Sequence, residues 1–198
     1  MMNAPHIHEV SESIREDSKT MYGFWVYLMT DFVLFASLFS VFIVLRGNVF
    51  AHGTADLFSM PGVLAETLIL LVSSLTSGLF LLAARAGNKQ TTLAWMFVTA
   101  VLGVAFLCIE VAEFRSLILE GNGPQKNGFL SAFFTLVGTH GLHIVAGVIW
   151  MLTLAAAIVQ HGLTRGNMRK LMLLGMFWHF LDIVWIFIFT IVYLIATV

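Results

Sequence analysis

Two short segments of this chain place ionisable side chains inside long apolar runs. Residues 177–185 carry His179 and Asp182 within a run that is otherwise hydrocarbon up to Val198. Residues 138–143 carry His140 and His143 in a second run. Ionisable groups at bilayer depth are costly, so they are usually buried against other helices and often functional. Their chemistry would be proton exchange, ligation of a redox cofactor, or hydrogen bonding between helices.

The spacing of these residues fits helices. His140 and His143 are three apart and share a helix face, and so do His179 and Asp182. A histidine–carboxylate pair is therefore possible within one helix, or across to His140 or His143. Small residues beside the first pair, Thr139 and Gly147, would let another helix approach closely.

Polar side chains also interrupt the other apolar runs. The other candidates for an intramembrane polar network are Asp31, Glu66, Ser73 and Ser77. Glu66, Ser73 and Ser77 line up on one helix face. Glu110 and Glu113 form an acidic pair that we expect near the outer end of its helix.

Composition sets the class of protein. The chain has 198 residues, of which 59% are hydrophobic and 11% are charged, and its mean hydropathy is +0.93. A soluble domain has about 25% charged residues, so these values indicate an integral membrane protein. The net charge of -1 and the lack of a basic stripe argue against a nucleic-acid partner. A single cysteine, Cys108, excludes an internal disulfide and a thiolate metal site.

Five segments are long and apolar enough to span a bilayer, which needs about 20 residues. We expect them near residues 22–45, 61–84, 93–114, 128–160 and 171–197. Because each segment must satisfy its own backbone in lipid, the predicted fold is an all-α integral membrane bundle of five transmembrane helices. The predicted linkers are residues 46–48, 87–89, 121–124 and 162–170. Residues 1–21 form a polar tail without the apolar core of a cleavable signal, and residues 22–198 form the transmembrane domain.

Lysine and arginine in the short loops predict the orientation. One predicted side carries Arg15, Lys19, Arg85, Lys89, Arg165, Arg169 and Lys170, and the other carries Arg46, Arg115 and Lys126. The richer side is the cytoplasmic one. The N-terminus is therefore expected in the cytoplasm and the C-terminus in the periplasm.

The histidine content bears on cofactors. Two haems with two histidine ligands each need more imidazoles than His140, His143 and His179 provide, and a copper centre needs more still. We therefore expect no cofactor and no metal in this chain. A serine hydrolase is also disfavoured, because no serine stands in a nucleophile elbow. A structural polar network and a proton or lipid-headgroup role remain open.

Five blocks in chain order resemble subunit III of the haem-copper oxidases, in the short form of bacterial cytochrome bo-type ubiquinol oxidases. The blocks are residues 23–31 (GFWVYLMTD), Glu66-Thr67 through Ser73-Ser74, 110–114 (EVAEF), 133–143 (FFTLVGTHGLH) and 178–185 (WHFLDIVW). They span nearly all of residues 22–198. Longer members of the family have seven helices, so this chain would lack the first two, which help to form a lipid-holding cleft. Asp31, after Thr30, stands where longer members have a carbodiimide-reactive glutamate after a serine.

The resemblance implies a non-catalytic subunit of an oxidoreductase complex. Haems and copper would lie in partner subunit I, and subunits II and IV and membrane phospholipids would be further partners. The complex would oxidise ubiquinol, reduce oxygen to water and move protons across a bacterial inner membrane. This multi-pass chain would stabilise subunit I and shape lipid and proton access. The alternatives are a stand-alone five-helix transporter with a polar path, and a dihaem cytochrome b.

Overall fold

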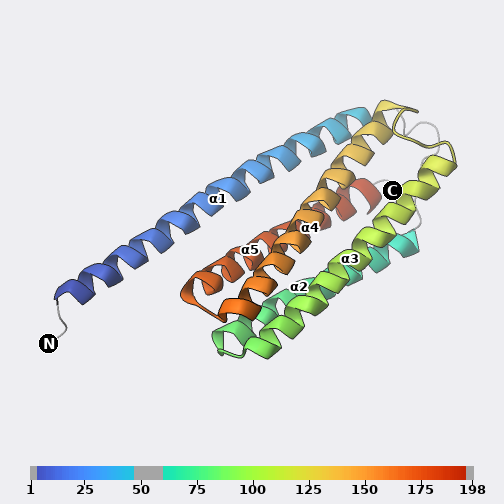
Figure 1. The fold of residues 1–198 in the computed structure, drawn as a ribbon. Helices are drawn as coiled ribbons and strands as arrows, with labels where there is room; N and C mark the ends of the chain where they lie inside the picture. Colours follow the sequence, from blue (N-terminus) through green and yellow to red (C-terminus); the bar gives the residue numbers. More distant parts are fainter. Residues whose placement is uncertain (1–3, 47–59, 195–198) are drawn as a thin grey trace.

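The computed structural model of the chain describes residues 4–46 and 60–194, and these residues form long helices joined by short turns (Figure 1). The elements are α1 (Ala4–Arg46), α2 (Met60–Arg85), α3 (Lys89–Leu119), α4 (Gly128–His161), α5 (Arg165–Ile188) and η3 (Phe189–Leu194). The last is a π-helix that continues α5. Among the described residues, five helices are long and apolar enough to cross a membrane. The predicted all-α bundle of five spans is confirmed in this respect.

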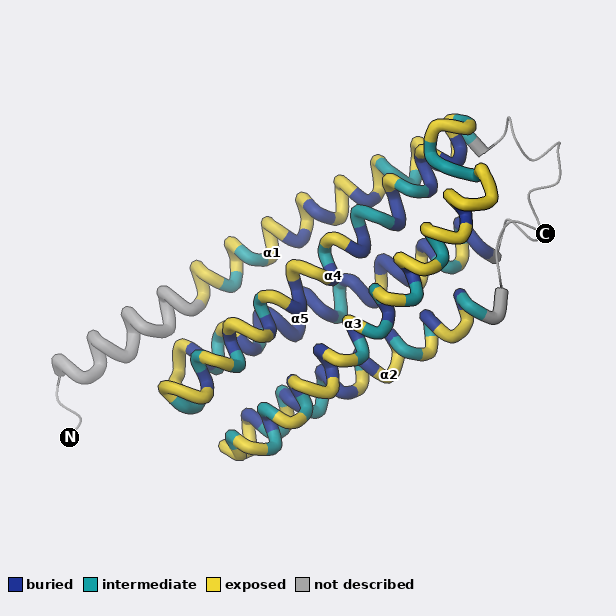
Figure 2. The backbone as a smooth tube through the Cα atoms, turned by 45° about the vertical axis from the view of Figure 1, so that its right-hand side comes forward, coloured by how far each residue is buried: buried dark blue, intermediate teal, exposed yellow. Residues whose placement is uncertain are grey.

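Helices α2 to α5 pack together, and α1 lies along the outside against α4 and α5 (Figure 1). Twelve of the 24 residues of α5 are buried, and they recur along its length, whereas α1 is exposed over much of its surface (Figure 2). The core consists mainly of aromatic and branched aliphatic side chains, such as Phe106, Phe133 and Trp178. Among the five described spans, α5 is therefore the most buried.

Side-chain caps fix the residues at which α4 and α5 begin. The Asn127 side chain accepts a hydrogen bond from the Leu130 amide at 2.8 Å, and α4 begins at Gly128 as predicted. The Thr164 hydroxyl accepts one from the Asn167 amide at 3.3 Å and starts α5 at Arg165. The predicted linker of residues 162–170 was therefore wrong after Thr164. The turn before it uses Gly162, whose φ of 73° favours glycine.

Two other helices are longer than expected. Helix α3 continues to Leu119 instead of ending near Phe114, so Glu110 and Glu113 lie about two turns inside it. Their predicted place at the outer end was wrong. Helix α1 begins at Ala4, so the backbone of the predicted polar tail is helical from that residue. The predicted linker residues after Arg46 lie outside the described residues.

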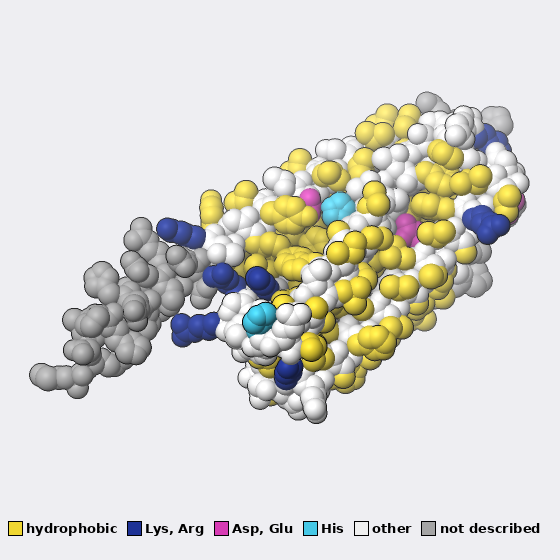
Figure 3. All heavy atoms as spheres, in the orientation of Figure 1, with side chains coloured by type: hydrophobic (Ala, Val, Ile, Leu, Met, Phe, Trp, Pro, Cys, Tyr) yellow, Lys and Arg dark blue, Asp and Glu magenta, His cyan; other side chains and the backbone are white. Residues whose placement is uncertain are grey.

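The surface has the pattern of a membrane protein. Apolar side chains cover the middle of the face in view, and the lysines and arginines lie toward the two ends (Figure 3). Large hydrophobic side chains such as Leu75 and Phe97 are about two-thirds exposed. Water would not tolerate so extensive an apolar surface, whereas lipid or a partner subunit would cover it.

Candidate functional site

The first polar centre joins α1 to α4. Asp31 Oδ2 lies 3.7 Å from His143 Nε2, and both side chains are more than four-fifths buried. His143 Nδ1 lies 2.7 Å from the Thr139 carbonyl oxygen, which only accepts, so Nδ1 donates its proton there. The Phe35 ring packs on the imidazole at 5.2 Å. The structure therefore pairs His143 with Asp31 of α1 and not with Asp182 of α5, which was one of the two arrangements that the sequence allows.

The second polar centre lies between α2 and α5. His179 Nδ1 is 3.7 Å from Asp182 Oδ2, so the two side chains lie next to each other on α5, as their spacing of three allows. The same nitrogen is 3.0 Å from Ser74 Oγ, and Nε2 is 3.4 Å from Ser77 Oγ. Ser77 donates its own proton to the Ser74 carbonyl at 2.8 Å, so its oxygen is left to accept from the imidazole. This centre thus fixes the ring by contacts from a neighbouring helix.

Trp178 ties α5 to three other helices. Its Nε1–H donates to Ser73 Oγ of α2 at 2.8 Å. A Cβ built on Gly103 of α3 would lie 2.9 Å from the indole, and one on Gly147 of α4 would lie 3.1 Å from it. The predicted close approach of a helix at Gly147 is therefore confirmed, and the group that fills the space is an indole.

Three carboxyl groups gather between α2 and α3. Glu66 interacts electrostatically with Glu110 and Glu113, and the Tyr193 hydroxyl of η3 lies beside Glu113. A Cβ on Gly141 of α4 would lie 2.7 and 2.8 Å from the two carboxyl oxygens of Glu110, so the carboxyl group fills the space beside this glycine. The predicted face of Glu66, Ser73 and Ser77 is indeed buried throughout. Glu66 faces this acidic group, whereas the two serines contact Trp178 and His179 of α5.

His140 stands apart from these centres. It is fully buried, stacks on Trp185 at 5.4 Å and meets the edge of Phe106 at 5.9 Å. Within the part of the chain that the structure describes, neither ring nitrogen has a hydrogen-bond partner. Its expected bond to α5 is therefore replaced by ring stacking on α5.

Three contributors were missed by the sequence analysis as site residues. For Ser74 the sequence offers a signal, because it stands directly beside Ser73, which lies on the predicted polar face. Trp178 and Tyr193 had none, because their contacts depend on how the helices rotate against each other. Over residues 4–46 and 60–194, no group of three or more His, Cys, Asp or Glu side chains has an arrangement that could hold a metal ion.

Comparisons with known proteins give one matching family and several similar proteins. Residues 6–197 match the family described as cytochrome c oxidase subunit III. The chain is 51% identical over 195 residues to cytochrome bo(3) ubiquinol oxidase subunit 3 of Pseudomonas aeruginosa, covering 96% of this chain and 91% of that protein. It is 40% identical over 183 residues to the protein of the same name from Buchnera aphidicola, covering 91% and 94%.

Proposed function

Since this chain belongs to the cytochrome c oxidase subunit III family, we propose that it works as a non-catalytic subunit whose complex carries its haems and copper in subunit I. The chain is a subunit III of a terminal quinol oxidase. The observation that carries the proposal is the match over residues 6–197, combined with polar centres that lack a metal-ligating arrangement among the described residues. Quinol oxidation and oxygen reduction would then take place in the partner.

The proposal extends to the setting of the complex. We assign it to the bacterial inner membrane, with ubiquinol as electron donor and with subunits II and IV beside subunit I. The names of the relatives, which are ubiquinol oxidase subunits, support this assignment.

Purification in mild detergent tests the proposed function. The tagged chain should bring down a haem-bearing polypeptide, and the eluate should consume oxygen when ubiquinol is supplied. Mass spectrometry of the eluted chains would identify the partners. A chain that elutes alone and moves a solute across reconstituted vesicles would instead establish the transporter alternative.

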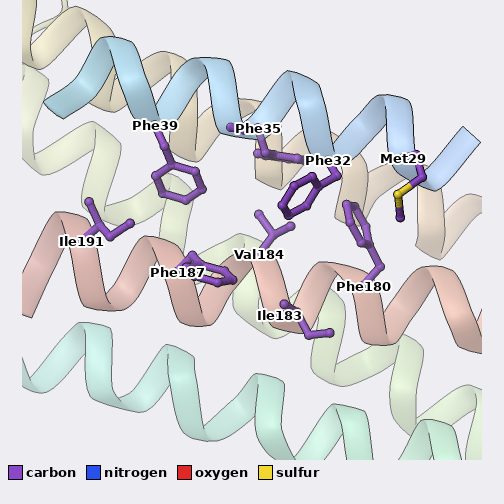
Figure 4. A pocket seen from close by; sticks show the side chains of 10 residues that line it. Met29, Phe32, Phe35, Phe39, Phe180, Ile183, Val184, Phe187 and Ile191 are labelled. Carbon is purple, nitrogen blue, oxygen red and sulfur yellow. The ribbon is translucent and has the colours of Figure 1, made fainter. Parts of the chain in front are cut away.

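An apolar groove between α1 and α5 supports a role in holding lipid. It has a volume of about 440 Å³. Its lining is entirely apolar and consists of Met29, Phe32, Phe35, Ala36, Phe39, Phe180, Ile183, Val184, Phe187 and Ile191 (Figure 4). A surface of this kind matches an acyl chain, because it offers no hydrogen-bonding group. Phospholipid would thus fill the gap between α1 and the rest of the bundle.

The Asp31–His143 pair supports a role in proton access. Since Nδ1 of His143 gives its proton to Thr139, the Nε2 that faces Asp31 is bare in the neutral ring. Two facing acceptors repel each other, so the contact is favourable only when one proton lies on Nε2 or on Asp31. The pair is thereby a place where one proton can be held and released beside the groove.

A further inference from the structure

Glu66 of α2 is a fully enclosed carboxyl group. Its exposed fraction is 0%, and in the described part of the chain neither of its oxygens has a hydrogen-bond partner. The groups on α3 with which it interacts electrostatically are Glu110 and Glu113. An ionised carboxylate only accepts hydrogen bonds, so burying one without a donor is costly. Glu66 therefore faces two further acids and requires a donor from its surroundings.

Glu110 and Glu113 have the same deficit. Glu110 Oε2 and Glu113 Oε1 are enclosed, and neither has a hydrogen-bond partner among the described residues. Among the described side chains, no lysine, arginine or histidine forms an ion pair with any of the three acids. Three ionised carboxylates without a counter-charge would repel one another strongly in hydrocarbon. The three side chains, which we call the acid cluster, are therefore stable together only when they carry protons.

The neighbouring helices shape a place for the acid cluster. The Glu110 carboxyl group fills the space beside Gly141 of α4, where a Cβ would lie 2.7 Å from one of its oxygens. The remaining titratable group that interacts with all three acids is Tyr193 of η3, whose ring lies 6.3 Å from that of Trp185. His140 is adjacent to Gly141 in the chain, but its ring stacks on Trp185. The cluster is thus walled by aromatic rings toward the core of the bundle.

A proton can leave the acid cluster without leaving an isolated charge. A protonated carboxyl group donates a hydrogen bond, so the two acids that stay protonated can both donate to the one that is ionised. When the proton goes to water, that carboxyl changes from neutral to anionic, and the reverse step returns the proton to it. Loss of a second proton would put two anions side by side, which is unfavourable.

Glu113 is the member of the cluster that lies nearest to water. It is half-buried, whereas Glu66 and Glu110 are buried. It precedes the end of α3 at Leu119 by six residues, or roughly 9 Å at 1.5 Å per residue. Glu66 likewise follows the start of α2 at Met60 by six residues. These two helix ends lie at the same end of the bundle, opposite the α2–α3 turn (Figure 1).

We propose that Glu66, Glu110 and Glu113 form a proton-binding site that exchanges a proton, through Glu113, with water at the end of the bundle opposite the α2–α3 turn. The site is separate from the Asp31–His143 pair, which joins α1 to α4. It goes beyond the proposed function, because its protons are held by this chain whatever the partner subunits are.

Infrared spectroscopy of the purified complex tests the site, because protonated carboxyl groups and carboxylates absorb at different frequencies. In mildly acidic buffer, the spectrum of wild type minus that of Glu66→Gln should contain a protonated-carboxyl band. A shift to alkaline buffer should remove the signal of about one more protonated carboxyl group from wild type than from Glu113→Gln. Glu113→Asp keeps the acid and should restore this loss, which guards against a poorly assembled Glu113→Gln variant.

Glu120→Gln is the matched control, because Glu120 is an exposed carboxyl group beyond the end of the same helix. It should change neither the protonated-carboxyl band nor the loss assigned to Glu113. The same alkaline loss in wild type and in Glu113→Gln would overturn the proposal, since the acids would then hold their protons in fixed hydrogen bonds. A Glu66→Gln difference spectrum without a protonated-carboxyl band would overturn it as well, since Glu66 would then be ionised.

Discussion

At the scale of single residues, Asp31 is the side chain whose proton role is most directly testable. Asp31→Asn keeps the size of the side chain but removes the site for a proton. If the pair with His143 delivers protons, turnover per haem should fall progressively as the buffer becomes alkaline, because bulk protons are then scarce. The haem content of the complex should stay normal. Oxygen consumption by the purified complex across a pH series measures this.

Asp31→Leu provides the comparison for a packing role. It leaves the buried His143 without its carboxylate, and so it should reduce assembly at every pH. A turnover per haem that stays at the wild-type level in both variants, from mildly acidic to alkaline buffer, would leave Asp31 with packing alone.

Ser73 makes a second prediction at this scale. Ser73→Ala removes the acceptor of the Trp178 indole N–H in a fully buried place. Intramembrane hydrogen bonds average about 0.6 kcal/mol and reach about 1.7 kcal/mol. The thermal unfolding midpoint of the purified complex should fall accordingly.

Ser40→Ala is the matched control, because the Ser40 hydroxyl donates to the Ala36 carbonyl of its own helix at an exposed site. It should leave the unfolding midpoint nearly unchanged. The same midpoint for both variants would show that the Trp178–Ser73 bond contributes little.

What the sequence predicts at this scale depends on whether a contact is local. The pair of His179 and Asp182 follows from a spacing of three, because both residues belong to one helix. The pair of Asp31 and His143 does not follow, since it requires the rotation and tilt of α1 against α4. The contact of Glu66 with Glu110 and Glu113 does not follow from the sequence either, because it depends on how α2 packs against α3. The sequence predicts only the local pair of Glu110 and Glu113.

At the scale of elements, the close contact of α3 with α5 should depend on glycine at position 103, which has no side chain. Gly103→Ala would place a Cβ 2.9 Å from the Trp178 indole. The indole has no room to retreat, because Gly147 and Ser73 hold it on other sides. Overpacking of this kind costs about 1–3 kcal/mol, so the unfolding midpoint of the complex should fall.

Gly23→Ala is the control for this substitution, because a Cβ there would meet nothing within 4 Å. It should be neutral or slightly stabilising, since alanine favours a helix over glycine. Equal unfolding midpoints for the Gly103→Ala and Gly23→Ala variants would mean that α3 and α5 adjust without cost.

Sequence reasoning finds the elements better than it finds their ends. The five apolar runs identify five helices, because hydropathy reports which residues lie in hydrocarbon. The helix itself continues until its backbone is capped, as at Thr164, where α5 starts six residues before the apolar run. For the same reason α3 passes Phe114 and carries Glu110 and Glu113 into its interior.

At the scale of the whole molecule, the charges at the ends predict an orientation. The α2–α3 and α4–α5 turns lie at the same end (Figure 1), and Lys89 Nζ donates to the Val159 carbonyl across them at 2.9 Å. Arg165 and Lys170 lie beside the same turns, so this end carries most of the basic residues and is expected to face the cytoplasm.

A pair of reporter fusions measures this orientation. Five crossings put the two termini on opposite sides, so a reporter that is active only in the periplasm should be active when fused after Val198 and silent when fused to the N-terminus. A reporter that is active only in the cytoplasm, inserted at Gly162 in the α4–α5 turn, should be active there. The reverse pattern would place the basic end in the periplasm and would contradict the predicted orientation.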